Sequence, residues 1–257
     1  MGGEPGFEEL VAEGESVPLA GWDFSWFDGR ATEERPTWGY SRLIGQRMAS
    51  ATTALDIQTG GGEVLAGIPF PPKVLVATES WPPNLKVAAR NLRPLGAAVL
   101  ATADEPALPF QANTFDLVVS RHPVHTWWDE IGRVLRPGGT YLSQQIGQGT
   151  VRELREAMVG KQPLSSQRAT SGAVAEAEGA GLVVVDLRQQ ALRTVFHDIA
   201  AVVHFLRKVV WTVPDFSVDR YRDRLRTLHN RIQAEGSFVT YAQRFLIEAR
   251  KPVPAFS

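Results

Sequence analysis

The residues best suited to chemistry surround a glycine-rich bend, LDIQTGGGEVLAG at positions 55–67. Asp56 precedes three consecutive glycines, and a second acid, Glu79, ends the next apolar run 19 residues after Gly60. Glycines allow positive φ angles and let the backbone approach a ligand, while a carboxylate at the tip of a strand can accept hydrogen bonds from both hydroxyls of a ribose. This spacing predicts a nucleoside-binding site.

Other ligands are compatible with a glycine bend, but their own signals are weaker in this sequence. No Lys-Ser or Lys-Thr follows the glycines, which argues against a phosphate-binding loop that turns over ATP or GTP. An NAD-dependent oxidoreductase is an alternative, although the glycines at 60–62 and 67 lack the G-x-G-x-x-G spacing. A bend that only makes a tight turn is the plainest alternative.

The elements that must position these residues alternate along the first part of the chain. Short apolar runs favour strands, and the segments between them have helical spacing, a rhythm typical of βαβ units. We therefore expect an α/β fold with a doubly wound, mainly parallel sheet and helices on both faces. The expected strands are 54–57, 73–78, 97–101, 115–120 and 140–146, and the expected helices are 84–92 and 127–137.

After residue 150 the alternation of strands and helices becomes less regular. Helices are expected at 151–159 and 171–181, and a last strand is expected at 244–251. Two helical stretches are expected on either side of residues 211–216. We expect one domain over residues 1–257, and its parts are an N-terminal arm or lid at 1–45, a cofactor-binding core at 50–147 and a helical insertion at 194–235 that roofs the substrate.

Composition excludes several functions. The formal net charge of −1 and a pI near 6.5 provide no field that would bind bulk nucleic acid. The chain has no cysteine, which excludes disulfides, a thiolate nucleophile and Cys-ligated zinc. Residues 1–15 are acidic and glycine-rich and are expected to be a frayed tail. No apolar stretch reaches the roughly 18 residues that span a bilayer, so a soluble, cytoplasmic protein without membrane contact is expected.

Three further segments are more specific than the glycine bend. They read VLVATES (74–80), ADEPALPFQANTFDLVVS (103–120) and RHPVHTWWDEIGRVLRPGGTYL (121–142). Together they resemble the Rossmann-like, class I methyltransferases that depend on S-adenosylmethionine, of the small-molecule type, over roughly residues 50–147. The resemblance implies a seven-stranded sheet whose last strand is antiparallel, S-adenosylmethionine as methyl donor and S-adenosylhomocysteine as product.

The resemblance also implies roles for individual residues. Asp56 and the glycine loop would hold the amino-acid end of the cofactor, and Glu79 the ribose. The residue that matches Asp104 would contact the adenine amino group, and the end of the fourth strand would lie where methionine and substrate meet. The expected cofactor-binding residues are Asp56, Gln58, Gly60, Gly61, Gly62, Glu79, Ser80, Asp104, Glu105, Ser120 and Arg121.

One position departs from the family pattern. The family's first motif usually has glycine two residues after the acid, where this chain has Gln58. A side chain there would crowd the methionine end of the cofactor, so we expect binding with an adjusted loop. A catalytically inactive, cofactor-binding regulatory protein is therefore an alternative to an enzyme.

The sulfonium of S-adenosylmethionine is already activated, so methyl transfer depends largely on orientation and desolvation. An acceptor hydroxyl or ammonium would benefit from a general base, and His122 is the first candidate because it follows the fourth expected strand. His197 is the second. His125, on the expected helix, and His204 are expected to be packed or solvent-facing, and no metal site is expected.

Specificity for a small-molecule acceptor is expected in two segments outside the shared core. Residues 21–40 are rich in aromatics and would form a lid or a packing arm. Residues 194–221 would roof the acceptor or simply pack on the sheet as an amphipathic helix. The basic run at 219–231 is interrupted by acids at helical intervals, which favours a solvated helix face. The expected acceptor-binding residues are Phe196, His197, Trp211 and Phe216.

Overall fold

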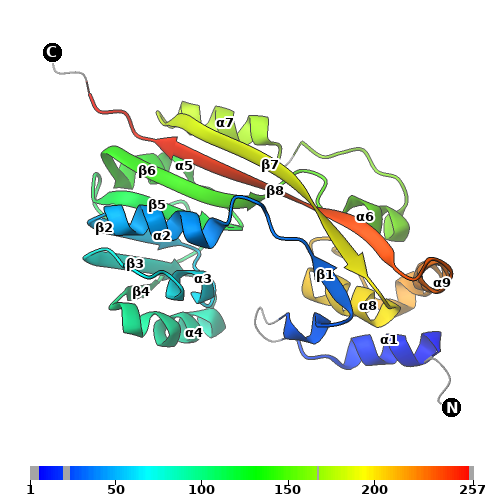
Figure 1. Ribbon diagram of the computed structural model, residues 1–257. Coiled ribbons are helices and arrows are strands. Elements are labelled where there is room, and N and C mark those ends of the chain that lie inside the picture. Colours follow the sequence, from blue (N-terminus) through cyan, green and yellow to red (C-terminus); the bar gives the residue numbers. More distant parts are fainter. Residues whose placement is uncertain (1–5, 20–23, 167, 255–257) are drawn as a thin grey trace. The chain divides into compact units, whose positions relative to one another are not determined.

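A computed structural model of the chain describes residues 6–19, 24–166 and 168–254 (Figure 1). The chain divides into two compact units. One, called here the sheet unit, contains Pro36–Gln148, Ser166–Gln190 and Arg244–Ser257. The other, called here the helical unit, contains Met1–Arg35, Gly149–Ser165 and Ala191–Gln243.

The sheet unit is built on parallel strands. β2 (Thr53–Ile57) pairs in parallel with β3 (Val74–Glu79) and β5 (Phe115–Arg121), while β4 (Ala98–Ala101) and β6 (Leu135–Ile146) extend the two sides. β8 (Phe238–Arg250) is antiparallel to β6. Through the described residues the strand order is β1-β7-β8-β6-β5-β2-β3-β4. The predicted Rossmann-like sheet with an antiparallel last strand is confirmed.

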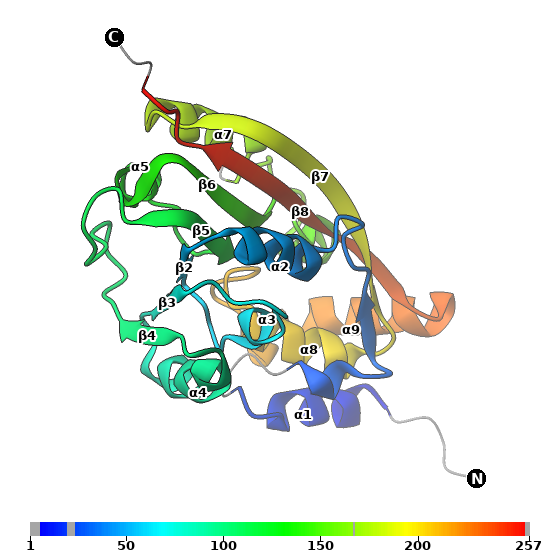
Figure 2. The same cartoon turned by 60° about the vertical axis from the view of Figure 1, so that its left-hand side comes forward.

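Side chains alternate between the two faces of this sheet, as the period of a strand requires. Leu55, Val118 and Tyr141 pack with α5 (Trp128–Val134) and α7 (Thr170–Gly179). Their strand neighbours, such as Ala54 and Leu117, face the other helices. These are α2 (Tyr40–Ser50), α3 (Glu63–Ala66) and α4 (Pro82–Leu92), and Figure 2 shows α2 across the strands. Helices on both faces were predicted, but α2 was not.

The helical unit has its own apolar core, formed by α1 (Phe7–Ser16), α6 (Arg152–Val159), α8 (Ile199–Lys208) and α9 (Val218–Glu235). A short 3₁₀ helix, η1 (Ser25–Phe27), lies between α1 and β1. β1 (Ala31–Glu33) pairs antiparallel with the end of β7 (Val183–Phe196). The described part of the sheet therefore has eight strands, one more than predicted, because β1 was not recognised.

Two local predictions were wrong. The N-terminal segment is not a frayed tail from residue 7 onward, because α1 buries Phe7, Leu10 and Val11; residues 1–5 lie outside the described part. The expected helix at 127–137 ends at Val134 and the following residues start β6. The Pro-Gly-Gly segment at 137–139, which was expected to end that helix, lies inside β6. The pairing of β5 with β6 is irregular there, and Gly138 has a φ of +80°.

Within the described residues, no helix is both long enough and apolar enough to cross a membrane. The 3₁₀ helix η2 (Arg93–Leu95) leads from α4 into β4.

Candidate cofactor site

Parallel pairing brings the carboxyl ends of β2, β3 and β5 to one edge of the sheet unit. Asp56 is in register with Ala77 of β3 and Val119 of β5, and Ile57 with Ser120. Ligands of open α/β sheets bind at this edge, outside the carboxyl ends of the strands. The predicted residues Asp56, Glu79 and Ser120 therefore lie at or next to the last residue of their strands, at the edge where a nucleoside would bind.

The glycine bend turns sharply after β2. Gln58, Gly60 and Gly62 all have positive φ angles, 57°, 64° and 76°. The Thr59 backbone N–H donates to the Thr78 carbonyl at 2.9 Å, which fixes the bend beside β3. A Cβ on Gly62 would lie 2.9 Å from the Leu92 side chain, so glycine is needed there for the approach of α4 as well as for its φ.

Asp56 is buried at the base of this bend. Its carboxylate accepts a hydrogen bond from the Thr59 hydroxyl at 2.6 Å. Burial raises the pKa of Asp56 to about 7, the Thr59 hydrogen bond opposes that rise, and the negative charge of Glu79 adds to it. A cationic ligand group beside Asp56 would favour its ionised form, which suits the ammonium of the cofactor's amino-acid end.

Glu79 has more partners than the sequence predicted. One carboxylate oxygen accepts from the Gly60 N–H at 2.7 Å. The other accepts from the backbone N–H groups of Ser80 at 3.0 Å and Trp81 at 2.8 Å, immediately before α4. Glu79 is only 7% exposed. It therefore ties the glycine bend to the start of α4, and a ribose hydroxyl would share this carboxylate with backbone donors.

Gln58 replaces the expected family glycine and has a defined contact. Its side-chain carbonyl accepts from the Val124 N–H at 2.6 Å, and its amide donates to the His125 carbonyl at 2.8 Å. The side chain thus joins the loop after β2 to the loop after β5. His125 is exposed in this loop and not on α5, so its predicted place on a helix was wrong.

The predicted adenine-side residues lie in the loops after β3 and β4. Ser80, Asp104 and Glu105 are exposed there. The Thr102 backbone N–H donates to the Glu79 carbonyl at 3.1 Å, which holds the start of the β4 loop beside the end of β3. This neighbourhood matches the order of ribose and adenine contacts that the sequence predicted, and the individual contacts stay predictions.

The Ser120 side chain is buried in the interior of the sheet unit. It is 1% exposed, and its hydroxyl contacts those of Tyr141 at 2.7 Å and Ser143 at 2.9 Å. The Tyr40 hydroxyl donates to the Ser120 carbonyl at 2.7 Å. The Ser120 side chain therefore belongs to a buried hydroxyl network, and its predicted contact with the cofactor has no support in this arrangement. Arg121, the next residue, is exposed.

His122 lies directly after β5 with a positive φ of 53°. Its backbone N–H donates to the Gln144 carbonyl at 2.7 Å, and its Nε2 lies 3.1 Å from the Gln144 side-chain nitrogen. The Trp38 indole N–H donates to the side-chain carbonyl of the same Gln144 at 2.8 Å. Burial, followed by the charges of Arg121 and Arg244, lowers the pKa of His122 well below its ordinary value.

The sequence did not identify Trp38 or Gln144. The available signal was weak: a Trp in an aromatic segment, and two consecutive glutamines inside an otherwise apolar strand. Phe27 and Trp38 are both buried in apolar cores, so these two aromatics of the proposed lid serve packing; residues 21–23 lie outside the described part.

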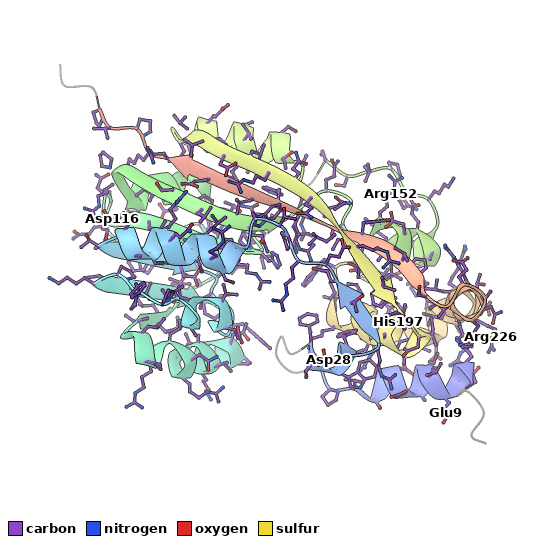
Figure 3. The ribbon with its side chains drawn as sticks, in the orientation of Figure 1. Glu9, Asp28, Asp116, Arg152, His197 and Arg226 are labelled. Carbon is purple, nitrogen blue, oxygen red and sulfur yellow. The ribbon has the colours of Figure 1, made fainter. Side chains whose placement is uncertain are left out.

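The predicted acceptor residues belong to the helical unit. Phe196 is 1% exposed and packs edge-on against Phe205, so its assignment as a pocket wall was wrong: it is core. His197 is exposed at the end of β7 (Figure 3), and Trp211 is 42% exposed. Phe216 is half-buried and stacks on Tyr221. It borders a hollow of ≈ 240 Å³ with Leu19, Leu206, Arg207, Val210, Val213 and Pro214.

Not every acid of the sheet unit lies at the ligand edge. Asp116, labelled in Figure 3, lies near the start of β5, where it accepts from the backbone N–H groups of Thr52 at 2.8 Å and Thr53 at 2.9 Å. Its role is to join two strands at the opposite edge. In the described part of the chain, His, Asp and Glu side chains do not gather in groups of three that could hold a metal ion.

The fold and the edge described above define a class of protein, the class I methyltransferase fold. A candidate methyltransferase of Bacillus halodurans superposes with a TM-score of 0.58 at 19% identity, over 84% of this chain and 100% of that one. Residues 55–143 match the family model described as "Methyltransferase domain". Residues 55–143 therefore match a methyltransferase domain, and the fold that the resemblance implied, that of the class I methyltransferases that depend on S-adenosylmethionine, is confirmed, whereas the small-molecule type stays a prediction.

Curated relatives match over shorter stretches. The mitochondrial arginine-hydroxylase NDUFAF5 of Mus musculus is 45% identical over 60 residues, which is 21% of this chain and 17% of that protein. The malonyl-[acyl-carrier protein] O-methyltransferase of a Marinomonas species is 29% identical over 119 residues, 43% of this chain and 44% of that protein. The alignment thus spans less than a fifth of the first of these relatives.

Proposed function

We propose that this chain transfers a methyl group from S-adenosylmethionine to a small-molecule acceptor. The observation that carries the proposal is the joint placement of Asp56, the glycine bend and Glu79 at the carboxyl ends of adjacent parallel strands, inside the matched segment 55–143. The two acids suit the ammonium and ribose of the cofactor. The bend supplies backbone that a ligand can approach closely.

We propose the acceptor-binding residues from the exposure of their side chains and from their aromatic or polar character. Trp211 and His197 are exposed and Phe216 is half-buried, so these three side chains can contact a ligand, whereas Phe196 cannot. An aromatic wall with a few polar groups is the usual lining of a small-molecule site. The printed functions of the two relatives, hydroxylation of arginine and O-methylation of a malonyl group, differ from each other, so neither is transferred to this chain.

A two-stage experiment tests the proposal. S-Adenosylhomocysteine should raise the melting temperature of the full chain and give heat in a calorimetric titration, because a ligand that binds only the native state stabilises it. NAD and ATP at equal concentration should do neither. Methyl transfer is then measured from S-adenosylmethionine with a labelled methyl group to a metabolite mixture. Tight binding of NAD and none of S-adenosylhomocysteine would overturn the cofactor assignment.

The same experiment separates an enzyme from an inactive cofactor-binding regulatory protein. Both would bind S-adenosylhomocysteine, but only an enzyme would label an acceptor. Trp211→Ala and His197→Ala should lower labelling while leaving S-adenosylhomocysteine affinity within about threefold. If labelling of the acceptor were unchanged in both variants, the proposed acceptor residues would be wrong even though the cofactor assignment held.

A further inference from the structure

The hydrogen bonds around Gln144 determine which nitrogen of His122 carries the proton. An indole N–H can only donate, so the Gln144 atom 2.8 Å from Trp38 Nε1 must be its carbonyl oxygen. The Gln144 NH₂ group then faces His122 Nε2 at 3.1 Å and donates to it. His122 Nε2 must therefore be the unprotonated acceptor, and the ring proton lies on Nδ1.

This arrangement holds the imidazole neutral. A proton on Nε2 would place an N–H of the ring against an N–H of Gln144, and Gln144, at 4% exposed, is too buried for water to relieve the clash. The positive groups that act on the ring are Arg121 and Arg244. A general base needs a free lone pair, and the Nε2 lone pair is occupied. His122 can therefore offer a hydrogen from Nδ1, which is the opposite of the general-base role predicted from sequence.

Cationic residues share this part of the sheet edge. Arg121 ends β5 opposite Gln144, and Arg244 lies on β8 opposite Ile146, the last residue of β6. The acids Asp56 and Glu79 lie at the ends of β2 and β3, on the other side of β5. The edge thus divides into an acidic part over β2 and β3 and a part over β5, β6 and β8 that carries two arginines and His122.

We propose that the methyl acceptor presents a carboxylate to this second part, with His122 Nδ1–H and the two arginines as its recognition groups. The proposal rests on the proposed methyltransferase function and names its substrate class. A carboxylate oxygen would attack the methyl carbon, forming an O–C bond while the C–S bond breaks and its electron pair goes to sulfur. The products are a methyl ester and neutral S-adenosylhomocysteine. No proton leaves the acceptor, so no general base is required.

The tautomer of His122 can be measured without an acceptor. In ¹⁵N NMR spectra of the full chain, the His122 ring should stay neutral with the proton on Nδ1 between pH 5.5 and 8. Gln144→Glu should raise the pKa of His122 and protonate Nε2, because a carboxylate there accepts a hydrogen bond. Gln145→Glu is the matched control, since Gln145 donates to Thr126 at 3.2 Å. A wild-type ring protonated on Nε2 would overturn the donor assignment.

Binding of the acceptor class is then tested on the chain saturated with S-adenosylhomocysteine. The probes are acetate, hexanoate and 3-phenylpropionate, each compared with its primary amide. At least one acid should shift the His122 Nδ1 signals and bind about tenfold or more tightly than its amide. Arg244→Gln should weaken binding of that acid about tenfold, whereas Arg250→Gln, at the other end of the pairing between β6 and β8, should leave it within about twofold. If acids and amides behave alike, or none shifts His122, the carboxylate assignment is wrong.

Turnover separates the two proposals. With a binding acid as acceptor, labelled methyl should appear as an ester that alkali releases as methanol, and His122→Phe should lower kcat/KM about tenfold or more while S-adenosylhomocysteine affinity stays within about threefold. Methylation of amines or alcohols but of no acid would leave the proposed function standing and overturn the carboxylate assignment. Failure of S-adenosylhomocysteine to bind would overturn the proposed function itself.

Discussion

The two parts of the ligand edge differ in how their side chains are held. Over β2 and β3, Glu79 is held by backbone, because it accepts hydrogen bonds from three main-chain N–H groups, and Asp56 accepts a hydrogen bond from the Thr59 side-chain hydroxyl, three residues away. Over β5 and β6, side chains are held by hydrogen bonds to other side chains. The Trp38–Gln144–His122 contacts link residues 106 and 22 positions apart.

This difference matters for binding. Backbone donors keep Glu79 at one place whatever ligand arrives, which suits a cofactor that the whole family shares. A histidine fixed by side chains on other elements can be altered by one substitution far along the chain. We therefore expect the acidic part over β2 and β3 to determine cofactor affinity. The part over β5, β6 and β8, called here the His122 part, should determine the choice of acceptor.

The largest effect should follow removal of the Glu79 charge. Glu79→Gln keeps one acceptor oxygen for three backbone donors, so we expect S-adenosylhomocysteine affinity to fall roughly ten- to a hundredfold and unfolding free energy by about 2 to 4 kcal/mol. A sequence-based expectation would be lost affinity with little change in folding. Calorimetry and urea denaturation measure the two quantities.

The matched control for Glu79 is Glu176→Gln, which removes the same charge from an exposed position of α7. It should change neither quantity measurably. If Glu79→Gln lost affinity but kept its full stability, the three backbone hydrogen bonds would contribute little, and the contrast between the two parts of the edge would weaken.

A smaller effect is expected for the pH dependence that Asp56 causes. Its pKa is about 7 in the folded chain and about 3.9 in an unfolded one, so the native state binds the proton more tightly. Stability due to this group is present below pH 4 and is lost as pH rises toward 7. Relative to Asp56→Asn, the wild type should lose about 1 to 3 kcal/mol of unfolding free energy between pH 5 and 8.

The comparison with Asp56→Asn isolates this group, because other titrating residues are common to both chains. Buried His204, for example, has its pKa lowered to about 4, chiefly by burial, and would add stability as pH rises. Urea denaturation at pH 5, 6, 7 and 8 provides the measurement. If unfolding free energy changed with pH in the same way for the wild type and Asp56→Asn, Asp56 would be ionised in the folded chain across this range.

Gln58 connects the two parts of the edge and should act locally. Gln58→Gly relieves the positive φ of a non-glycine residue but removes both hydrogen bonds to Val124 and His125, so unfolding free energy should change by less than about 1 kcal/mol. The Val124 amide should nevertheless exchange with solvent about tenfold faster. Gln58→Glu keeps only the hydrogen-bond acceptor. The exchange rate of its Val124 amide should therefore lie between those of the wild type and Gln58→Gly. Unchanged exchange in both variants would mean that the loop after β5 is held by its other contacts.

The acidic part of the edge could be predicted because its signals are local. Glycines, an acid at the end of one strand and an acid at the end of the next follow from chain order alone. The same holds for the parallel strands, whose apolar runs are contiguous. α1 also had a local signal that composition obscured: Phe7, Leu10, Val11 and Gly14 are spaced for one helix face.

The His122 part could not be predicted in this way. Trp38 and Gln144 are joined only once the chain folds, and the types Trp and Gln have many other uses. The identity of the residues also does not reveal that His122 adopts a positive φ or that Ser120 turns inward. Such properties depend on what neighbouring strands place beside them, and sequence-based assignments of Ser120, Phe196 and the base His122 could not take this into account.

A further prediction tests whether the network around Ser120 is structural. Tyr141→Phe removes the hydroxyl 2.7 Å from Ser120, but the Ser120 and Ser143 hydroxyls still pair at 2.9 Å. Unfolding free energy should therefore fall by only about 1 kcal/mol, and the melting temperature by about 2 to 4 °C, with S-adenosylhomocysteine affinity unchanged within about twofold. Tyr241→Phe, at a 40% exposed tyrosine, is the control and should have no effect on either. A tenfold loss of affinity in Tyr141→Phe with retained stability would instead place Ser120 in contact with the cofactor, as the sequence predicted.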